Sequence, residues 1–421
     1  MANSEHLALI EKGAEVWNSW YAEHKKVIPD LSQANLSNLK LEGINLKKAI
    51  LTQANLSNAD LTKAQLSYAD LSKANLLGAN LNDADFKGTN LDYVIFFKAI
   101  INRQTIMAAK YRQIHQIVNH KGENKDFSGV DLSNSNLFRV DLSNAELSNA
   151  KLLNVNFNSA NLNSAYLYKA DLTGANLQNA DLRNAYFSHA NLTSAYLGEA
   201  LCCGTYFKDA ELNFANLKTA KFSHKTMIDL KWYSVWEIVN RGAAKKNLSG
   251  ADLSNANLQD TDFEEANLTN AKLSNAILRR SNLTNANLTN TNLVGANLCG
   301  VDLDRANLKG AKLKSVISDR HTQLSNIGSN NNLVVKERPV VTVDLTKADK
   351  TGIQQPTLNT PIAENSVTEV KRNKQPRTKW WIILFLMIVG IAAGSIFWIQ
   401  NPNHPLFTKF ETWKNPSQLG Q

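Results

Sequence analysis

The chain has 421 residues, of which 43% are hydrophobic and 20% charged, so wholesale disorder is excluded and the length suggests two to four domains. Three cysteines cannot form a disulfide framework, and the N-terminal residues lack the basic segment and apolar run of a secretory signal. The formal net charge of +9 leaves nucleic acid and an anionic membrane surface as alternatives until the charges are located.

Residues 1–30 are expected to form an N-terminal capping helix. Leu7, Ile10, Trp17 and Tyr21 recur at helical spacing, so they would lie along one face of a single helix of about twenty residues. This helix directly precedes a repeat that begins at Leu31, and we expect it to cover the first turn of that repeat.

A five-residue repeat dominates the rest of the sequence. From Leu31 an apolar residue returns at every fifth position in three runs: run 1 (31–100) with fourteen units, run 2 (126–224) with twenty and run 3 (247–318) with fourteen. The consensus is Ala-(Asn/Asp)-Leu-(Ser/Thr)-(Asn/Gly), as in Ala160-Asn161-Leu162. A period of five matches neither a helix nor a strand, and on a helix the leucines would gather on no face.

Ala and Leu two positions apart share one face of a short extended segment, and the small residues that follow redirect the chain. The repeat therefore predicts a solenoid with Ala and Leu inside and the polar residues outside. No proline occurs between Pro29 and Pro339, as a ladder that uses most backbone donors requires. The core leucines chosen to represent this inward face are Leu36, Leu56, Leu71, Leu142, Leu162, Leu172, Leu182, Leu258, Leu288 and Leu298.

The repeat resembles the pentapeptide-repeat family, whose signature is A-(D/N)-L-x-x. The resemblance implies a mainly β fold, a right-handed quadrilateral β-helix with four units per coil. The N-terminal pattern of Leu9, Gly13, Trp17, Asn18 and Trp20 resembles the cyanobacterial type of the family. Some members inhibit DNA gyrase, a type II topoisomerase, by mimicking DNA with a strongly acidic solenoid.

Two insertions, residues 101–125 and 225–246, interrupt the repeat and resemble one another at a constant offset of 121 residues. Apolar residues at three- and four-residue spacing predict a short amphipathic helix in each. We expect these helices to cap solenoid ends, and Trp17, Trp20, Trp232 and Trp236 are candidates for cap contacts or for a partner-binding surface. The far end of run 3 would be covered by Val334-Val335 or Val340-Val341, or left for a partner.

Residues 319–379 are expected to form a flexible linker, because prolines and polar residues occur there without sustained periodicity. Residues 380–399 are twenty uncharged residues with tryptophans at both ends, which predicts a transmembrane helix in contact with membrane lipid. A buried core helix is the alternative. Basic residues at 371–379 place the repeats in the cytoplasm and the tail, 400–421, outside, in the periplasm or thylakoid lumen.

Gly390 and Gly394 lie four residues apart in the predicted span, on one helix face, where small residues favour a transmembrane homodimer. The alternative interpretation is that they are ordinary glycines of a membrane helix.

The net charges of residues 31–100, 126–222 and 247–314 are +1, −2 and 0, so the solenoid is nearly neutral and we expect no nucleic-acid partner. We also expect no catalytic residues, cofactor or metal site, because the eight histidines show no ligand spacing. The sequence thus favours a non-catalytic, membrane-tethered scaffold that binds an unknown protein. The alternatives are a DNA-mimicking topoisomerase inhibitor and an enzyme with an unrecognised site.

Overall fold

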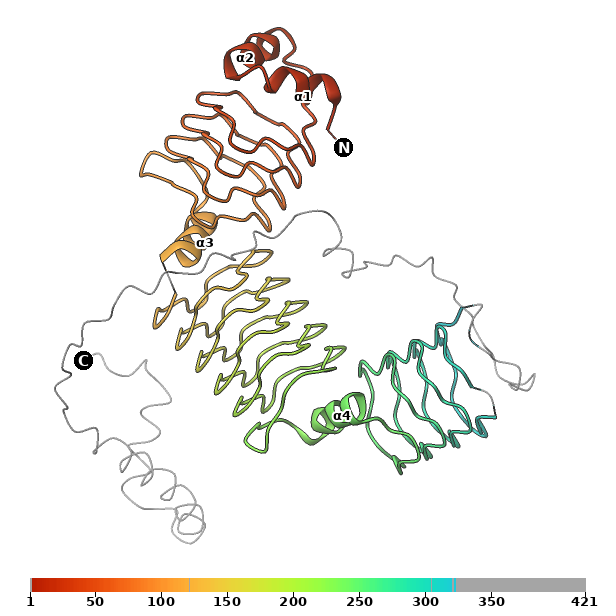
Figure 1. Cartoon of the computed structure of the whole chain (residues 1–421). Helices are drawn as coiled ribbons and strands as arrows, with labels where there is room; N and C mark the ends of the chain where they lie inside the picture. The colour runs from red at the N-terminus through yellow and green to blue at the C-terminus, as the bar shows by residue number, and fades with distance from the viewer. Residues whose placement is uncertain (1, 121, 304, 320–321, 323–421) are drawn as a thin grey trace, which may run out of the picture. The chain divides into compact units, whose positions relative to one another are not determined.

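The computed structural model describes residues 2–120, 122–303, 305–319 and 322. Within these residues four helices alternate with solenoid runs: α1 (Ser4–Ile10) and α2 (Ala14–Glu23) precede run 1, α3 (Ala109–His120) follows it, and α4 (Leu230–Arg241) follows run 2 (Figure 1). The runs consist of single-residue parallel bridges separated by tight turns rather than of long strands.

Bridge partners lie twenty residues apart, which is four five-residue units. The series begins with Asp30 opposite Ile50 and ends with Asn297 opposite Ile317. Each coil of the solenoid therefore contains four units, as the family resemblance implies. The last bridge of run 1, Asp85 with Ile106, and that of run 2, Tyr206 with Met227, span one residue more.

The unit at residues 60–64 shows why five residues suffice and why proline is absent. The N–H groups of Asp60, Leu61 and Lys63 donate to carbonyls of the neighbouring coils at 2.8–2.9 Å. The N–H of Thr62 donates to the Asp60 carboxylate at 3.1 Å, and that of Ala64 closes a turn to the carbonyl of Leu61 at 3.0 Å. All five backbone donors are used, so a proline anywhere in the unit would remove a hydrogen bond.

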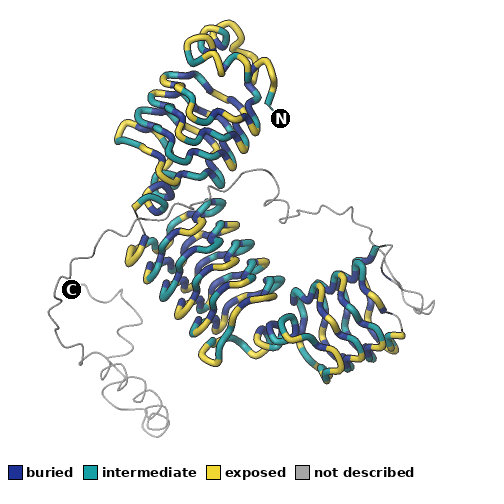
Figure 2. Tube along the Cα trace, viewed as in Figure 1, coloured by how far each residue is buried: buried dark blue, intermediate teal, exposed yellow. Residues whose placement is uncertain are grey.

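The interior is formed mainly by Leu, Phe and Ala side chains that belong to one hydrophobic cluster. Figure 2 shows buried positions recurring along the coils of each run. All ten leucines chosen from the sequence to represent the inward face have no exposed surface. At the corners the second residue after each Leu adopts a left-handed conformation, for example Asn58 with φ 56°. Asn and Gly tolerate this conformation best, which explains their place in the consensus.

The N-terminal cap contains two helices and not the single helix expected from the spacing of its apolar residues. α1 ends at Ile10, and Gly13, with φ 103°, joins it to α2. A positive φ is accessible to glycine, so the chain turns here and cannot continue as one helix. Ile10 and Trp17 are fully buried and Tyr21 is almost so, which places one apolar side of each helix against run 1.

Within the described residues no helix is long and apolar enough to cross a membrane. The predicted span at 380–399, its Gly390 and Gly394, and the tail at 400–421 lie outside those residues, as do Val334-Val335 and Val340-Val341. The predicted linker lies outside them except for Asp319 and Thr322.

Candidate interaction surface

The N-terminal cap is attached to run 1 by side-chain bonds to the backbone. The Trp17 indole donates to the carbonyl of Asn45 at 2.7 Å, and the Tyr21 hydroxyl donates to that of Lys47 at 2.9 Å. The Asn18 amide donates to the carbonyl of Gly43 at 3.0 Å and accepts from the N–H of Asn45 at 2.7 Å. These bonds satisfy backbone groups at the end of the solenoid that lack a neighbouring coil.

Trp20 is the more accessible tryptophan of this cap. It is partly exposed, packs against Trp17 at 5.3 Å between ring centroids, and stacks on His24 at 5.0 Å. Trp17, by contrast, has no surface left for a partner.

Helix α4 covers the end of run 2 in the same manner. The Trp236 indole donates to the carbonyl of Ala220 at 2.8 Å and its ring stacks on Phe222 at 4.8 Å. Asn240 both donates to the carbonyl of Leu217 and accepts from the N–H of Thr219. Trp232 and Trp236 are 7% and 8% exposed, so their own chain covers almost all of their surface.

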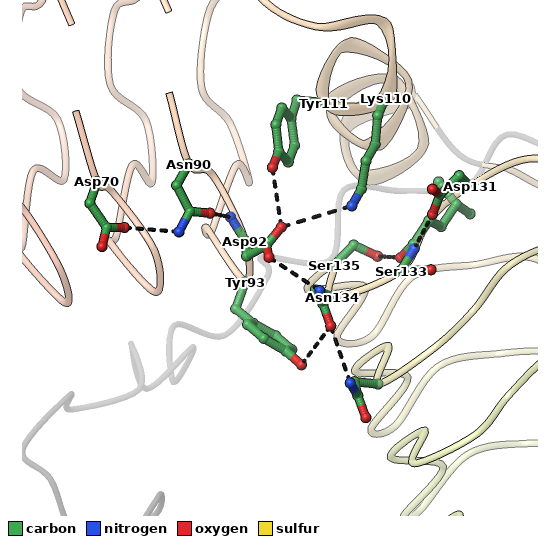
Figure 3. A network of polar contacts seen from close by, with 12 residues as sticks. Asp70, Asn90, Asp92, Tyr93, Lys110, Tyr111, Asp131, Ser133, Asn134 and Ser135 are labelled. Carbon is green, nitrogen blue, oxygen red and sulfur yellow. Dashed lines mark hydrogen bonds and ion pairs between the residues drawn. The ribbon is translucent and has the colours of Figure 1, made fainter. Parts of the chain in front are cut away.

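The junctions also join one run directly to the next. The N–H of Tyr93 donates to the carbonyl of Asn134 at 2.8 Å, and the Asp92 carboxylate accepts from Asn134 at 3.2 Å and from the Tyr111 hydroxyl at 3.1 Å (Figure 3). Burial and the nearby Asp92 charge raise the pKa of Tyr111 to about 12, so this hydroxyl keeps its proton. The second junction repeats the backbone bond, from Phe214 to Asn255 at 2.7 Å.

An apolar ladder crosses the outside of run 2. Tyr166, Tyr186, Tyr206 and Met227 are successive bridge partners, and we name these four residues the aromatic stripe. The rings of Tyr166 and Tyr186 stack at 4.9 Å with an interplanar angle of 2°, and those of Tyr186 and Tyr206 lie 6.4 Å apart. Tyr166, Tyr186 and Met227 are 46%, 45% and 58% exposed. The stripe is thus a row of ordered but accessible apolar side chains.

Other exposed groups lie within three residues of the stripe along the chain, and we call them its border. Leu230, the first residue of α4 and three residues after Met227, is 80% exposed. Tyr168 packs beneath the Lys169 ammonium at 5.1 Å and against the edge of His189. Lys208 forms ion pairs with both Asp209 and Asp229. The hydrogen bonds to these two carboxylates raise the pKa of Lys208, and the bond to Asp229 has the larger effect. The border therefore carries fixed charges of both signs.

The sequence reasoning missed this stripe. Its signal is tyrosine repeated at intervals of twenty residues at the Asn/Asp position of the unit. An interval of twenty residues places side chains on one face only if each coil holds four units. The spacing of five does not show how many units a coil holds, and only the family resemblance implied four.

The equivalent ladders of the other runs are polar. Run 1 carries Asn45, Gln65 and Asp85 there, followed by Ile106. Run 3 carries asparagines whose amides bond along the ladder, Asn267 to Asn247 at 3.1 Å and Asn307 to Asn287 at 3.4 Å. Among the described residues, tyrosine occupies this ladder in run 2 and in neither of the other two runs.

Groups with potential chemistry occupy structural positions. Cys202 takes a Leu position with no exposed surface, and burial raises the pKa of its thiol, which disfavours the reactive thiolate. The hydroxyl and N–H of Ser128 hold the pKa of Asp126 below its usual value, as in an ordinary turn. Within the described ranges no cluster of three or more His, Cys, Asp or Glu side chains is placed to bind a metal ion.

Comparison with known families gives a match over most of the solenoid. A profile described as pentapeptide repeats matches the chain in 8 copies, and the matched residues include 30–67, 64–103, 126–163, 150–188, 185–223, 247–285 and 281–317. No curated protein matches the chain.

Solved structures of pentapeptide repeat proteins are also similar to the chain. HetL, described as involved in heterocyst differentiation regulation in the cyanobacterium Nostoc sp. strain PCC 7120, is 27% identical over 68% of this chain and 92% of its own, with a TM-score of 0.14. A protein of the Arabidopsis thaliana thylakoid lumen is 31% identical over 27% and 77%, with a TM-score of 0.19. Full-length QnrB1, a plasmid-mediated fluoroquinolone resistance protein, is 14% identical over 68% and 92%, with a TM-score of 0.21.

Proposed function

Because the chain belongs to the pentapeptide-repeat family, we propose that it is a non-catalytic scaffold whose β-helix binds a protein partner through the aromatic stripe of run 2. The observation that carries this proposal is the exposed, stacked pair Tyr166 and Tyr186, continued by Tyr206, at a ladder that carries no tyrosine in runs 1 and 3. Tyrosine is enriched at the energetic centres of protein interfaces, because its rigid ring buries much area and its hydroxyl still forms hydrogen bonds.

The restricted positions of the rings in the stripe support a role in binding. Stacking already restricts the rings of Tyr166 and Tyr186, so these side chains lose less entropy when a partner binds them. Fixed charges of both signs border the stripe, which suits a polar rim around an apolar centre. A protein surface fits this arrangement better than a phosphate backbone does, since the solenoid runs are close to neutral.

The proposal includes tethering of the scaffold to a membrane by residues 380–399, with the repeats on the cytoplasmic side. Its support is the uncharged twenty-residue segment and the basic residues that precede it. Small residues at Gly390 and Gly394 support pairing of two such helices. The pattern from Leu9 to Trp20 supports a scaffold of the cyanobacterial type. A protease added to intact cells would then cut at Lys409 or Lys414 and leave the repeats whole.

DNA mimicry on a type II topoisomerase is the weaker alternative, because it requires an acidic solenoid and the three runs sum to almost no charge. An enzymatic function gains no support from the described residues, where the Asp126 carboxylate serves a turn and the Cys202 thiol lies in the core.

The experiment compares two matched tyrosine variants. Tyr166→Asn with Tyr186→Asn removes the stacked pair, and Tyr196→Asn makes the same change at another ladder of run 2, opposite Asn176. Proximity labelling identifies partners of the wild-type chain, and the affinity of the purified partner is then measured for each variant. We expect the stripe variant to weaken binding at least tenfold, about 1.4 kcal/mol, and the control to bind like wild type. Equal affinities for all three chains would refute the proposal.

A further inference from the structure

Helices α3 and α4 occupy equivalent places, 121 residues apart, but differ at the side chain that anchors each to the preceding run. His115 Nε2 lies 2.8 Å from the carbonyl oxygen of Ala99, and Trp236 Nε1 donates to that of Ala220 at the same distance. A carbonyl oxygen only accepts hydrogen bonds, so Nε2 carries the proton of a neutral His115. The histidine thus substitutes for an indole as a one-donor anchor.

The second nitrogen of His115 has no such role. The residue is 4% exposed, and Nδ1 is buried without a hydrogen-bond partner in the described part of the chain. A neutral imidazole tolerates this, because Nδ1 then carries a lone pair and no proton. Protonation would place an N–H group and a positive charge in a position that offers no acceptor, which is strongly unfavourable.

Among the described residues, the side chains that act electrostatically on His115 are Arg112 and His120, and no carboxylate does so. Both residues lie on α3 itself. From the last coil of run 1, the ring contacts the Ala99 carbonyl and the edge of Phe96. The carboxylates of this junction interact elsewhere, Asp92 with Tyr111 and Lys110, and Asp131 with Lys110.

We propose that the α3 junction is an acid-sensitive hinge: protonation of His115 at Nδ1 places a charged N–H group in a buried position without an acceptor and so favours release of α3 from the last coil of run 1, whereas the Trp236 anchor keeps the α4 junction closed. Opening at α3 would loosen run 1 from run 2 and leave the aromatic stripe on run 2 intact. The inference is independent of which partner that stripe binds.

The direction of the pH effect follows from burial. Burial lowers the pKa of His115 below its ordinary value of 6.5, against the smaller effect of the Ala99 carbonyl, and His120 and Arg112 lower it further. Because the folded state disfavours the proton, neutral His115 stabilises the closed junction fully above pH 6.5. This contribution is lost as the pH falls from 6.5 through the pKa that His115 has in the folded state. One proton gives at most a tenfold change in the opening equilibrium per pH unit.

Hydrogen exchange of the full-length chain tests the proposal. Amide exchange is measured at pH 7.5 and 5.0, corrected for the intrinsic pH dependence of the chemical step. We expect faster opening of α3 at pH 5.0, by up to about tenfold for each pH unit below 6.5, with α4 changed by less than about twofold. No acceleration in α3, or an equal acceleration in both helices, would overturn the proposal.

Three variants assign the effect to one side chain. His115→Trp installs the anchor of the α4 junction, and His115→Gln keeps a donor toward Ala99 without a titrating group, so one remains informative if the other fails to fold. Both should remove the pH dependence of α3, and its persistence would overturn the proposal. His120→Gln should preserve the pH dependence of exchange in α3. If this variant lost that dependence, His120 would be the titrating switch and the proposal would be overturned.

Discussion

Runs 2 and 3 bury the same residue types and expose different ones. Leu162 and Leu283 occupy equivalent inward positions and are both fully buried. On the outside, Tyr166 and Tyr186 of run 2 correspond to Asn287 and Asn307 of run 3. The inner column is constrained because neighbouring coils stack every twenty residues, whereas an outward side chain is partly surrounded by solvent. A solenoid therefore changes its surface without changing its fold, and a departure from the consensus on the outside is informative about function.

The largest expected effect tests the shared interior. Leu162→Ala and Leu283→Ala each remove buried volume between two coils, so we expect each to lower the free energy of unfolding of its run by about 2–5 kcal/mol. Hydrogen exchange resolved by run measures both. Lys151→Ala and Lys272→Ala, equivalent exposed positions, serve as controls expected to change stability by less than about 0.5 kcal/mol. If leucine and lysine variants behaved alike, the inward and outward assignment would be wrong.

A smaller effect distinguishes the two outer ladders. In run 2 a double-mutant cycle of Tyr166→Ala and Tyr186→Ala should give a coupling energy of about 0.5–1.5 kcal/mol, because the rings stack at 4.9 Å. The same cycle on Asn287 and Asn307 should give less, since their exposed amides meet at 3.4 Å. Equal coupling energies in both runs would contradict the contrast between the ladders.

Grafting sharpens the same contrast. Asn287→Tyr with Asn307→Tyr copies the stacked pair into run 3, where the ladder spacing is the same. We expect the variant to keep its fold and to change stability by no more than about 1 kcal/mol, as measured by denaturant unfolding. Loss of the fold would show that the outer ladder is not free to vary.

The smallest effect concerns a feature that the runs share. Burial raises the pKa of Asp131 and of Asp252, but hydrogen bonds from Ser133 and Ser254 outweigh it and hold both pKa values below 3.8. Each carboxylate therefore stabilises its turn above the ordinary carboxyl pKa and loses that contribution as the pH falls through the folded value. Ser133→Ala and Ser254→Ala should raise the two pKa values similarly in an NMR titration. A pKa shift in only one of the two runs would show that the turns at Asp131 and Asp252 are not equivalent.

The sequence predicted the repeat positions in full detail. The spacing of five, the Ala and Leu two apart and the missing proline led to a solenoid with the leucines inside, and the structure buries all ten of the leucines chosen to represent it. These inferences depend on local chemistry that repeats many times, so the pattern is unambiguous.

The N-terminal cap was harder to predict. Leu7, Ile10, Trp17 and Tyr21 match one helix, yet the structure breaks the segment at Gly13 to bring two short helices onto the first coil. Spacing alone could not show this, because a glycine inside a helical pattern is compatible with either outcome. Packing against the end of run 1 decided it.

By itself, the sequence determined which residues face the solenoid axis, because that choice follows from the size and polarity of each position in a unit of five. Only the tertiary structure decided which outward residues become neighbours, because Tyr166, Tyr186 and Tyr206 meet through coils that close every twenty residues. It also decided that Trp232 and Trp236 are covered by their own chain, and the contacts of Trp236 with Ala220 and Phe222 lie on coils that precede the helix. Contacts across coils depend on how the chain closes on itself, and a five-residue pattern read along the chain does not contain that information.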